Sequence, residues 1–238
     1  MALESQQIEP ILHQELDPSS QELVCPECGV RSPWADELLS LREQVITDPL
    51  TGLYNVRHFR SALEVELERT VRTGSPTSLM MIDLDHFKQV NDQWGHEVGN
   101  QVLKLTANLI KEVTRQLDIQ CRYGGEEFVV ILPSTNILLA SQVAERLRKR
   151  IQASKISVGD ASFEITTSIG LAVKVAGEHG SAAQLIKAAD ECLYEAKEAG
   201  RNRVCFVNDV VEQEMMVSHD EKAALMGMFF DVEDEYEG

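Results

Sequence analysis

The side chains with the clearest chemical potential in this chain are two adjacent glutamates, Glu126 and Glu127, which directly follow a Gly-Gly pair. These four residues separate two runs of strand-forming residues, 119–123 and 128–132. The pattern predicts a β-hairpin, because glycine reaches positive φ without steric cost. Carboxylates on a turn that a ligand can approach closely suit a hard cation, or a phosphate that is bound through such a cation. Two exposed glutamates at an ordinary tight turn are the alternative interpretation.

A second acidic cluster follows a short apolar run at 78–83, which is typical of a buried strand that delivers a side chain to a site. The run ends in Asp83, and Asp85 follows after one residue, so both carboxylates are available where the strand stops. An Asp-x-Asp pair is weak evidence for a site when it stands alone. This cluster therefore indicates a site only in combination with other motifs.

Two further patterns carry charged side chains at a defined spacing. Lys197 and Arg201 bracket the end of a predicted helix, where cations often interact only with the helix dipole. Arg115 and Asp118 form an Arg-x-x-Asp pattern shortly before the hairpin turn. Most such patterns are exposed ion pairs that contribute little to stability. Only their positions relative to the hairpin make both patterns evidence for a functional site.

In their order along the chain, the motifs resemble those of the GGDEF family, the diguanylate cyclases. The sequence Gly124-Gly125-Glu126-Glu127-Phe128 is similar to the family's signature in its GGEEF spelling. The resemblance covers about residues 46–207, with all five signatures in family order. The other four signatures are the Asp-Pro-Leu-Thr-Gly-Leu-Tyr-Asn sequence at 48–55, residues 83–100, the pattern of Arg115 and Asp118, and residues 194–203 with Lys197 and Arg201.

The resemblance implies condensation of two GTP molecules into cyclic di-GMP with release of pyrophosphate. It implies that Asp83, the main-chain carbonyl of Leu84 and Glu126 hold two Mg²⁺ ions per active site, with Mn²⁺ as the alternative ion. Glu126 is also the implied proton acceptor. The role of the third catalytic acid, Glu127, stays open between a second ligand and a hydrogen-bond partner. The implied substrate-binding residues are Phe87, Lys88, Asn91, Asn100, Gly124, Gly125, Lys197 and Arg201.

The resemblance also implies regulation by the product and assembly into dimers. Arg115 and Asp118 match an inhibitory site, which binds cyclic di-GMP away from the catalytic centre. Each subunit would hold one GTP, so two domains must face each other in a catalytic homodimer. Asn100 stands where the family typically has an aspartate, which leaves open a relaxed base specificity with cyclic GMP-AMP as a product. A non-catalytic receptor for cyclic di-GMP is a further alternative, although the metal aspartate and the hairpin acids are intact.

Composition limits the partners of the chain. The 238 residues carry a net charge of −17, which argues against nucleic acid or an anionic membrane as the main partner. No apolar run approaches the length of a membrane-spanning helix, and the N-terminus has no signal-peptide pattern. The five cysteines are odd in number and scattered. We therefore expect a cytoplasmic protein in a reducing environment rather than a disulfide framework.

Three segments are predicted along the chain. Residues 1–45 form an irregular arm that ends in a short linker helix, and they contain Cys25 and Cys28 in a Cys-x-x-Cys pattern. This pattern is either half of a structural Zn²⁺ site, which a second chain would complete, or two free thiols. Residues 46–207 form the catalytic domain, and residues 208–238 form an acidic tail whose partner is unknown.

The elements that must position these residues alternate between helices and strands. After the helix of the arm, the expected order is helix, strand, helix, hairpin, helix, strand and helix. This order predicts an α+β fold in which a largely antiparallel central sheet is flanked by helices. The resemblance to the GGDEF family implies a fold of the same kind, which is nucleotidyl-cyclase-like. The segment at 163–175 alternates strictly and is predicted as one half-buried strand. Asn55 and Ser181 are expected to cap helices, Gly200 to end the last one, and the other helices are expected at 56–71, 102–114 and 134–151.

Overall fold

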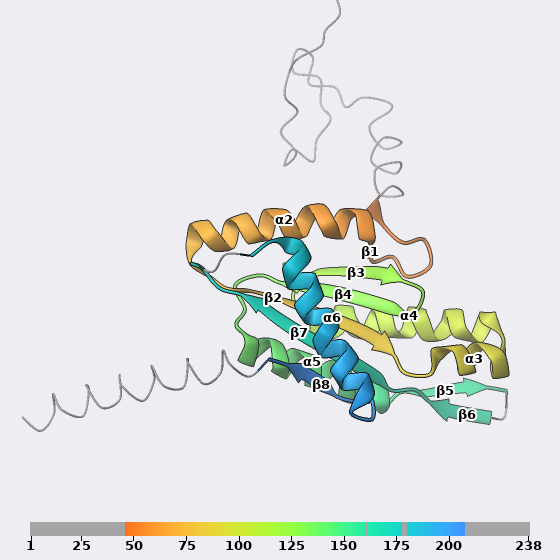
Figure 1. The fold of residues 1–238 in the computed structure, drawn as a ribbon. Coiled ribbons are helices and arrows are strands. Elements are labelled where there is room, and N and C mark those ends of the chain that lie inside the picture. The colour runs from red at the N-terminus through yellow and green to blue at the C-terminus, as the bar shows by residue number, and fades with distance from the viewer. Residues whose placement is uncertain (1–45, 160, 178–179, 208–238) are drawn as a thin grey trace, which may run out of the picture. The chain divides into compact units, whose positions relative to one another are not determined.

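The computed structural model describes residues 46–159, 161–177 and 180–207, which form one six-stranded sheet, helices on both of its faces and a separate two-stranded sheet (Figure 1). No helix within these ranges combines the length and the apolarity needed to cross a membrane. The expected helix of the arm, the Cys-x-x-Cys pattern and the acidic tail lie outside the described residues. The elements in chain order are β1 (Tyr54–Asn55), α2 (Val56–Thr73), β2 (Thr77–Leu84), α3 (Phe87–Trp94), α4 (His96–Val113), β3 (Ile119–Gly124), β4 (Glu127–Leu132), α5 (Ile137–Gln152), β5 (Lys155–Val158), β6 (Ala161–Glu164), β7 (Thr167–Lys174), α6 (Ala182–Glu198) and β8 (Val204–Phe206).

The strands of the main sheet follow the order β1-β3-β4-β2-β7-β8. The four inner strands pair antiparallel, whereas the edge strands β1 and β8 run parallel to β3 and β7. The sheet is therefore largely antiparallel, and the expected α+β class is confirmed. Strand β2 lies between β4 and β7 and is hydrogen-bonded on both edges, so its end is held firmly in place.

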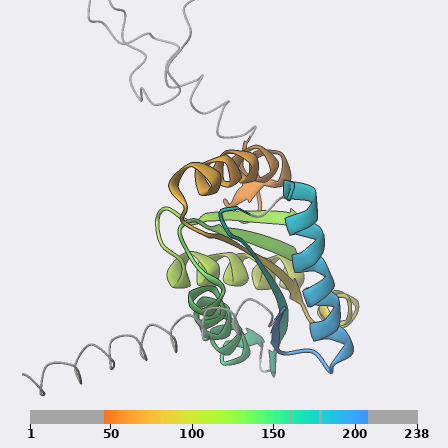
Figure 2. The ribbon, with the colours of Figure 1, turned by 60° about the vertical axis from the view of Figure 1, so that its left-hand side comes forward.

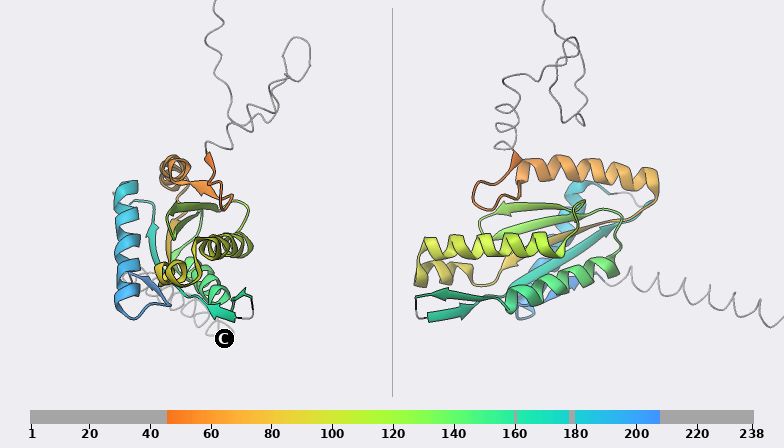
Figure 3. Two further views of the ribbon diagram at one scale, coloured as in Figure 1. Left: turned by 90° about the vertical axis from the view of Figure 1, so that its right-hand side faces the viewer. Right: turned by 180° about the vertical axis from the view of Figure 1, so that it is seen from behind.

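Strand β2 separates two apolar cores, because alternate side chains point to opposite faces of a sheet. Leu79 and Met81 pack with α2 and α6, whereas Met80 and Ile82 pack with α3, α4 and α5. Figure 2 and Figure 3 show this arrangement, with α2 and α6 on one side of the sheet and the other helices on the opposite side. All eight residues of β2 are buried, so the sheet has no solvent-facing side at this strand.

Capping residues set the helix boundaries. Asn55 is the N-cap of α2, and its side chain accepts two hydrogen bonds from backbone N–H groups of the first turn. Ser181 caps α6 in a capping box with Gln184. Gly200 follows α6 with a φ of 109°, a conformation that favours glycine. These three predictions are confirmed, whereas α5 begins after its N-cap Asn136, later than predicted.

The alternating segment at 163–175 does not form one half-buried strand, so that prediction is wrong. It contains the end of β6 and the whole of β7, with a break between them. Strand β7 is buried because α6 packs on one face and α5 on the other. The approach of α6 is so close that a Cβ on Gly170 would lie 2.1 Å from the carbonyl oxygen of Ala189 in that helix. Strand β6 pairs with β5 instead, and its Phe163 stacks on Trp94 of α3. The short elements β1, α3, β5 and β8 have no counterpart among the predicted elements.

Candidate active site

Two adjacent strands bring the predicted catalytic acids together. Asp83, near the end of β2, lies directly opposite Glu127, the first residue of β4, in the antiparallel register. Glu126 precedes β4 in the hairpin turn, and its carbonyl oxygen accepts a hydrogen bond from the Leu84 N–H at 3.4 Å. The three acids thus lie around the end of β2.

Lys197 of α6 offsets part of this negative charge. Its ammonium Nζ lies 2.9 Å from the Asp83 carboxylate Oδ2. Asp83 is only 8% exposed, and burial raises the pKa of its carboxyl group; Lys197 opposes this increase and the charge of Glu126 adds to it. Burial also raises the pKa of Glu127, and the charge of Asp83 adds to that shift. One lysine among three acids leaves an excess of negative charge, which a divalent cation would balance.

The neighbouring Asp85 has a structural role. It is 4% exposed, and its carboxylate accepts hydrogen bonds from the hydroxyl groups of Thr166 and Ser168, each at 2.7 Å. The same carboxylate accepts a hydrogen bond from the Asn202 N–H at 3.0 Å. Because these partners occupy both carboxylate oxygens, Asp85 ties the end of β2 to β7 and to the turn after α6.

The Gly-Gly turn of the hairpin differs from the predicted turn in its conformation. Neither Gly124 nor Gly125 has a positive φ, so a left-handed backbone is not the reason for glycine here. A Cβ on Gly124 would lie 3.3 Å from the Glu127 carboxylate Oε2, whereas one on Gly125 would meet nothing within 4 Å. The glycines therefore provide space beside the acids, and the backbone at Gly125 stays open to the approach of a ligand.

A clamp that the sequence pattern did not predict holds this turn. The Arg122 guanidinium donates to the Gly125 carbonyl oxygen through Nε at 3.2 Å and Nη2 at 2.8 Å, and its Nη1 lies 3.2 Å from Asp48 Oδ2. Burial acts to raise the pKa of Asp48, but hydrogen bonds from Thr51 and the charge of Arg122 outweigh it, so the pKa is lowered. The Asp-Pro-Leu-Thr segment before β1 is therefore connected directly to the hairpin turn.

The predicted base-contacting residues come from the junction of α3 and α4. Asn91 of α3 packs against Gly99 of α4, whose neighbour is Asn100. A Cβ on Gly99 would lie 2.0 Å from Asn91 Oδ1 and 3.2 Å from the Phe87 ring, so only glycine leaves the Asn91 side chain in place. Phe87 is buried, Asn91 and Asn100 are half-buried, and Lys88 is exposed. The two amides are thus held at a partly open surface, as recognition of a ligand requires.

Arg201 lies on a turn of unusual conformation at the end of α6. Gly200, Arg201 and Asn202 have φ values of 109°, 62° and 47°, so two residues other than glycine adopt the left-handed region. Such a conformation persists only where surrounding contacts hold it. The hydrogen bond from the Asn202 N–H to Asp85 is one of these contacts. The turn is therefore fixed to the end of β2, where the acids lie.

The acids and the adjacent carbonyl group fit a magnesium site. Proteins hold Mg²⁺ through one or two carboxylates, while water and substrate phosphates complete the octahedron. Within the ranges that the structure describes, no group of three or more acidic, histidine or cysteine side chains is arranged to hold a metal ion. Asp83 and Glu126, with the Leu84 carbonyl group beside them, supply only oxygen donors. Such a small donor set suits a cation that arrives together with a nucleotide.

A comparison with protein families decides the assignment. The family described as "Diguanylate cyclase, GGDEF domain" matches residues 45–203 of this chain. The chain belongs to the GGDEF family. The match includes all the acids around the end of β2, the two amides of α3 and α4, and the turn after α6.

Individual GGDEF proteins are similar over the same region. The response regulator PleD of Caulobacter vibrioides is 42% identical over 164 residues, which are 68% of this chain and 36% of PleD. The coiled coil and GGDEF domain of DgcB from Caulobacter crescentus, solved in complex with c-di-GMP, has 31% identity and a TM-score of 0.68, and the match covers 72% of this chain and 91% of that chain. The diguanylate cyclase SiaD of Pseudomonas aeruginosa, solved with its activator SiaC, has 40% identity and a TM-score of 0.67 over 72% of this chain and 65% of that chain. This chain therefore spans about a third of the length of PleD.

In this GGDEF domain, Arg115 and Asp118 line a pocket of about 210 Å³ whose lining includes none of the three acids. The buried Asp118 carboxylate accepts a hydrogen bond from the Arg115 N–H at 2.6 Å. Burial raises the pKa of Asp118, and the Arg115 hydrogen bond opposes this increase. Arg146 of α5 also lines the pocket, although the sequence pattern did not predict it, and its Nη2 donates to the Val113 carbonyl oxygen at 2.6 Å. Two arginines and one aspartate therefore share one cavity.

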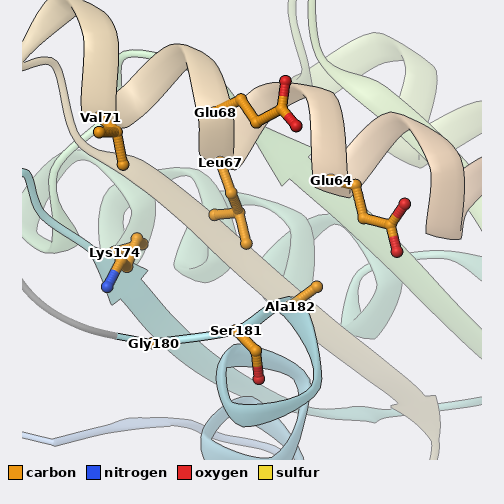
Figure 4. Close-up of a pocket in the computed structure, with 8 residues that line it drawn as sticks. All are labelled: Glu64, Leu67, Glu68, Val71, Lys174, Gly180, Ser181 and Ala182. Atoms are coloured by element: carbon orange, nitrogen blue, oxygen red, sulfur yellow. The ribbon is translucent and has the colours of Figure 1, made fainter.

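A larger pocket of about 420 Å³ lies between α2 and the start of α6 (Figure 4). Helix α2 contributes Glu64, Leu67, Glu68 and Val71, and Lys174 at the end of β7 lies across from them. None of the predicted catalytic, substrate-binding or inhibitory residues lines this pocket. Although this pocket is larger than the pocket of Arg115 and Asp118, its lining residues do not make it the candidate active site.

Proposed function

We propose that this protein is a diguanylate cyclase, which condenses two GTP molecules into cyclic di-GMP and releases pyrophosphate. The observation that carries the proposal is the cluster at the end of β2, where Asp83 lies opposite Glu127 and pairs with Lys197. Membership in the GGDEF family and the similarity to diguanylate cyclases such as SiaD support it. A receptor that only binds the dinucleotide would not need these acids, so the cluster favours an enzyme.

Divalent metal ions are expected at this cluster. Asp83, Glu126 and the Leu84 carbonyl group would hold Mg²⁺, or Mn²⁺ in its place, and the adjacent Glu127 would be either a second ligand or a hydrogen-bond partner. When bound, the metal neutralises charge on the phosphates and favours ionisation of the attacking hydroxyl group. Lys197 pairs with Asp83 and is still partly exposed, so its ammonium group is available to the triphosphate as well.

The remaining side chains bind and orient the nucleotide. Phosphoryl transfer needs in-line placement of the attacking 3′-hydroxyl group and compensation of charge rather than covalent catalysis. Arg201 would join Lys197 on the triphosphate oxygens, while Asn91 and Asn100 would contact the guanine edge. Glu126 would accept the proton of the 3′-hydroxyl group. The base and the triphosphate would thus be bound by different elements around the end of β2. Binding at both ends of the nucleotide would orient the α-phosphate that lies between them.

The reaction joins two nucleotides, whereas one domain offers one such site. We therefore expect a catalytic homodimer in which two domains face each other, each with one GTP. Assembly of this kind brings the 3′-hydroxyl group of each nucleotide to the α-phosphate of the other.

The pocket of Arg115, Asp118 and Arg146 is the proposed site of feedback inhibition by the product. Two guanidinium groups suit the phosphodiester oxygens or a guanine edge, and the carboxylate can accept guanine N–H donors. Because this pocket is lined by residues other than the catalytic acids, product binding would not compete directly with GTP.

Incubation of the purified protein with Mg²⁺ and GTP tests the proposed function. Mass spectrometry is expected to detect cyclic di-GMP and pyrophosphate, and EDTA is expected to stop the reaction. Protein that binds cyclic di-GMP but makes none from GTP would support the receptor alternative and overturn the proposed activity.

Replacement of Gly99 by alanine is expected to weaken GTP binding. The new Cβ would lie 2.0 Å from Asn91 Oδ1, so the Asn91 side chain must leave its position. Loss of its hydrogen bonds to guanine would cost about 1–3 kcal/mol. KM for GTP should therefore rise about 5- to 150-fold in steady-state kinetics. Asn91→Ala is the control: it should give a similar KM, and the double variant should be no worse than either single one. An unchanged KM in folded Gly99→Ala protein would contradict this assignment.

Asn100 predicts weaker discrimination between GTP and ATP than an aspartate would give. An ionised aspartate accepts both the N1–H and an exocyclic amine hydrogen of guanine, whereas asparagine has one acceptor oxygen and an NH₂ group that only donates. This NH₂ group can donate to adenine N1, which an aspartate would repel. Cyclic GMP-AMP is therefore an expected second product when both nucleotides are present.

Competition between equimolar GTP and ATP measures this selectivity, with the products separated by mass. Asn100→Asp is expected to favour GTP about ten- to a hundredfold more strongly than the wild type, which corresponds to about 1.5–3 kcal/mol for one charge-assisted hydrogen bond. If both proteins make only cyclic di-GMP at equal rates, this prediction is wrong. Asn100 then contributes nothing to base selectivity, and Asn91 and the backbone are sufficient to select guanine.

A further inference from the structure

Arg148 of α5 contacts the turn after α6. Its side chain is only 14% exposed, and its Nη1 donates to Asn202 Oδ1 at 2.8 Å and to Gln152 Oε1 at 2.9 Å. Its Nε and Nη2 both donate to Glu145 Oε2, at 3.1 and 3.0 Å. Gln152 and Glu145 belong to the same helix and orient the guanidinium group, whereas Asn202 lies 54 positions further along the chain. Arg148 therefore links α5 to the turn through one side chain.

The turn that Arg148 contacts depends on such support. Three successive residues, 200–202, have positive φ, and two of them are not glycine. Asn202 is held twice, because its N–H donates to Asp85 at the end of β2 and its side-chain oxygen accepts from Arg148. The residue before it is Arg201, which the proposed function places on the triphosphate. Arg201 is also held through its own backbone, because its N–H donates to the Ala196 carbonyl oxygen at 3.0 Å and its carbonyl oxygen accepts from Arg203 Nε at 3.1 Å. The contacts on Asn202 add to these in fixing the turn that carries Arg201.

We propose that Arg148 is a positioning residue for GTP binding, which holds the Asn202 side chain and thereby orients Arg201 toward the triphosphate. The inference rests on the proposed function, because the turn needs this orientation only if it binds a nucleotide. Four hydrogen bonds to protein groups use most of the five N–H donors of the guanidinium group. Arg148 therefore acts through the turn and not on the nucleotide itself.

The Arg148→Met variant tests this role, because methionine keeps much of the side-chain length and removes every donor. KM for GTP is expected to rise about 10- to 100-fold, by analogy with the loss found when a residue that orients a metal ligand is removed. The value of kcat should change little, because the acids at the end of β2 keep their places. Arg148→Lys should recover part of the loss, since an ammonium group can donate to Asn202 but cannot form the same fork.

Arg150→Met is the matched control on the same helix. Arg150 is exposed and pairs with Glu112 instead of the turn, so its KM for GTP should match the wild type. Initial rates are measured at low conversion, so that product binding at the pocket of Arg146 does not contribute. Thermal unfolding of each variant shows whether a change in stability accompanies the change in KM.

A double-mutant cycle with Asn202→Gly separates positioning from general stability. Glycine suits the positive φ and keeps the N–H that donates to Asp85, so it removes the acceptor of Arg148 and leaves this backbone contact in place. If Arg148 acts through Asn202, the double variant should have the KM of the single variants, whereas independent effects would multiply and overturn the inference. Equal KM values for Arg148→Met and Arg150→Met, with or without a lower melting temperature, would also overturn it. Wild-type protein that makes no cyclic dinucleotide would overturn the proposed function instead.

Discussion

Replacement of Asp83 by asparagine is expected to lower the rate of cyclic di-GMP synthesis at least about 100-fold while the domain stays folded. Asparagine keeps the size of the side chain but removes the charge that a bound cation requires. Loss of one such electrostatic group commonly lowers the rate by about 10²–10³-fold. The fold should survive, because Lys197 would lose its partner but is 30% exposed and can be hydrated. Mass spectrometry of the products and thermal unfolding measure the two effects.

Variants of other acids complete this test. Glu126→Gln should be as inactive as Asp83→Asn. Glu127→Gln separates the two roles left open for Glu127, since a metal ligand predicts a comparable loss and a hydrogen-bond partner a smaller one. Glu64→Gln is the matched control, because the exposed Glu64 lines the larger pocket between α2 and α6 and should be dispensable. Normal product formation by folded Asp83→Asn protein would disprove the assignment of the site.

Replacement of Arg115 by alanine is expected to relieve inhibition by the product. The variant loses a bidentate, charge-assisted contact of about 1.5–3 kcal/mol, so the inhibition constant for cyclic di-GMP should rise about ten- to a hundredfold. The loop should keep its shape, because the backbone N–H of Arg115, and not its side chain, binds Asp118. The initial rate without added product should therefore stay close to the wild-type value.

Inhibition curves with added cyclic di-GMP measure this effect. Arg146→Ala should weaken inhibition as well, because Arg146 lines the same pocket from α5. Arg150→Ala is the control for a loss of positive charge on that helix outside the pocket, and it should leave the curve unchanged. If Arg115→Ala and wild-type protein are inhibited equally, this pocket is not the inhibitory site.

Local sequence was sufficient for the residues that stand at the ends of their own elements. Asp83 ends an apolar run, and the acids of the hairpin follow two glycines between two strand-like runs, so their elements could be predicted from neighbouring residues. Ser181 and Gly200 likewise mark α6 through capping chemistry that involves only adjacent turns. The family motifs then related these segments to one another, which periodicity alone does not do.

The residues that the sequence pattern missed act across long separations. Arg122 meets Asp48 over 74 positions, and Arg146 donates to the Val113 carbonyl group over 33 positions. An arginine on a strand or helix has the same local pattern whether it is free or paired, so only the fold supplies its partner. The burial of β7 could not be predicted for the same reason. Its alternating sequence predicts one solvent-exposed face, but α5 and α6 cover both faces of the strand.

Strand β2 also restricts how the length of this chain can vary. Its side chains alternate between two cores, and both of its edges are paired. One residue added within Thr77–Leu84 would therefore turn the side chains on one side of the insertion toward the wrong core or displace Asp83 from Glu127. The turn before the strand is less restricted, because Gly74 is exposed and nothing lies within 4 Å of its Cβ position; only its positive φ of 77°, which ends α2, must be kept. Insertions, whether natural or engineered as a reporter tag, therefore belong at Gly74 and not in the strand that follows it.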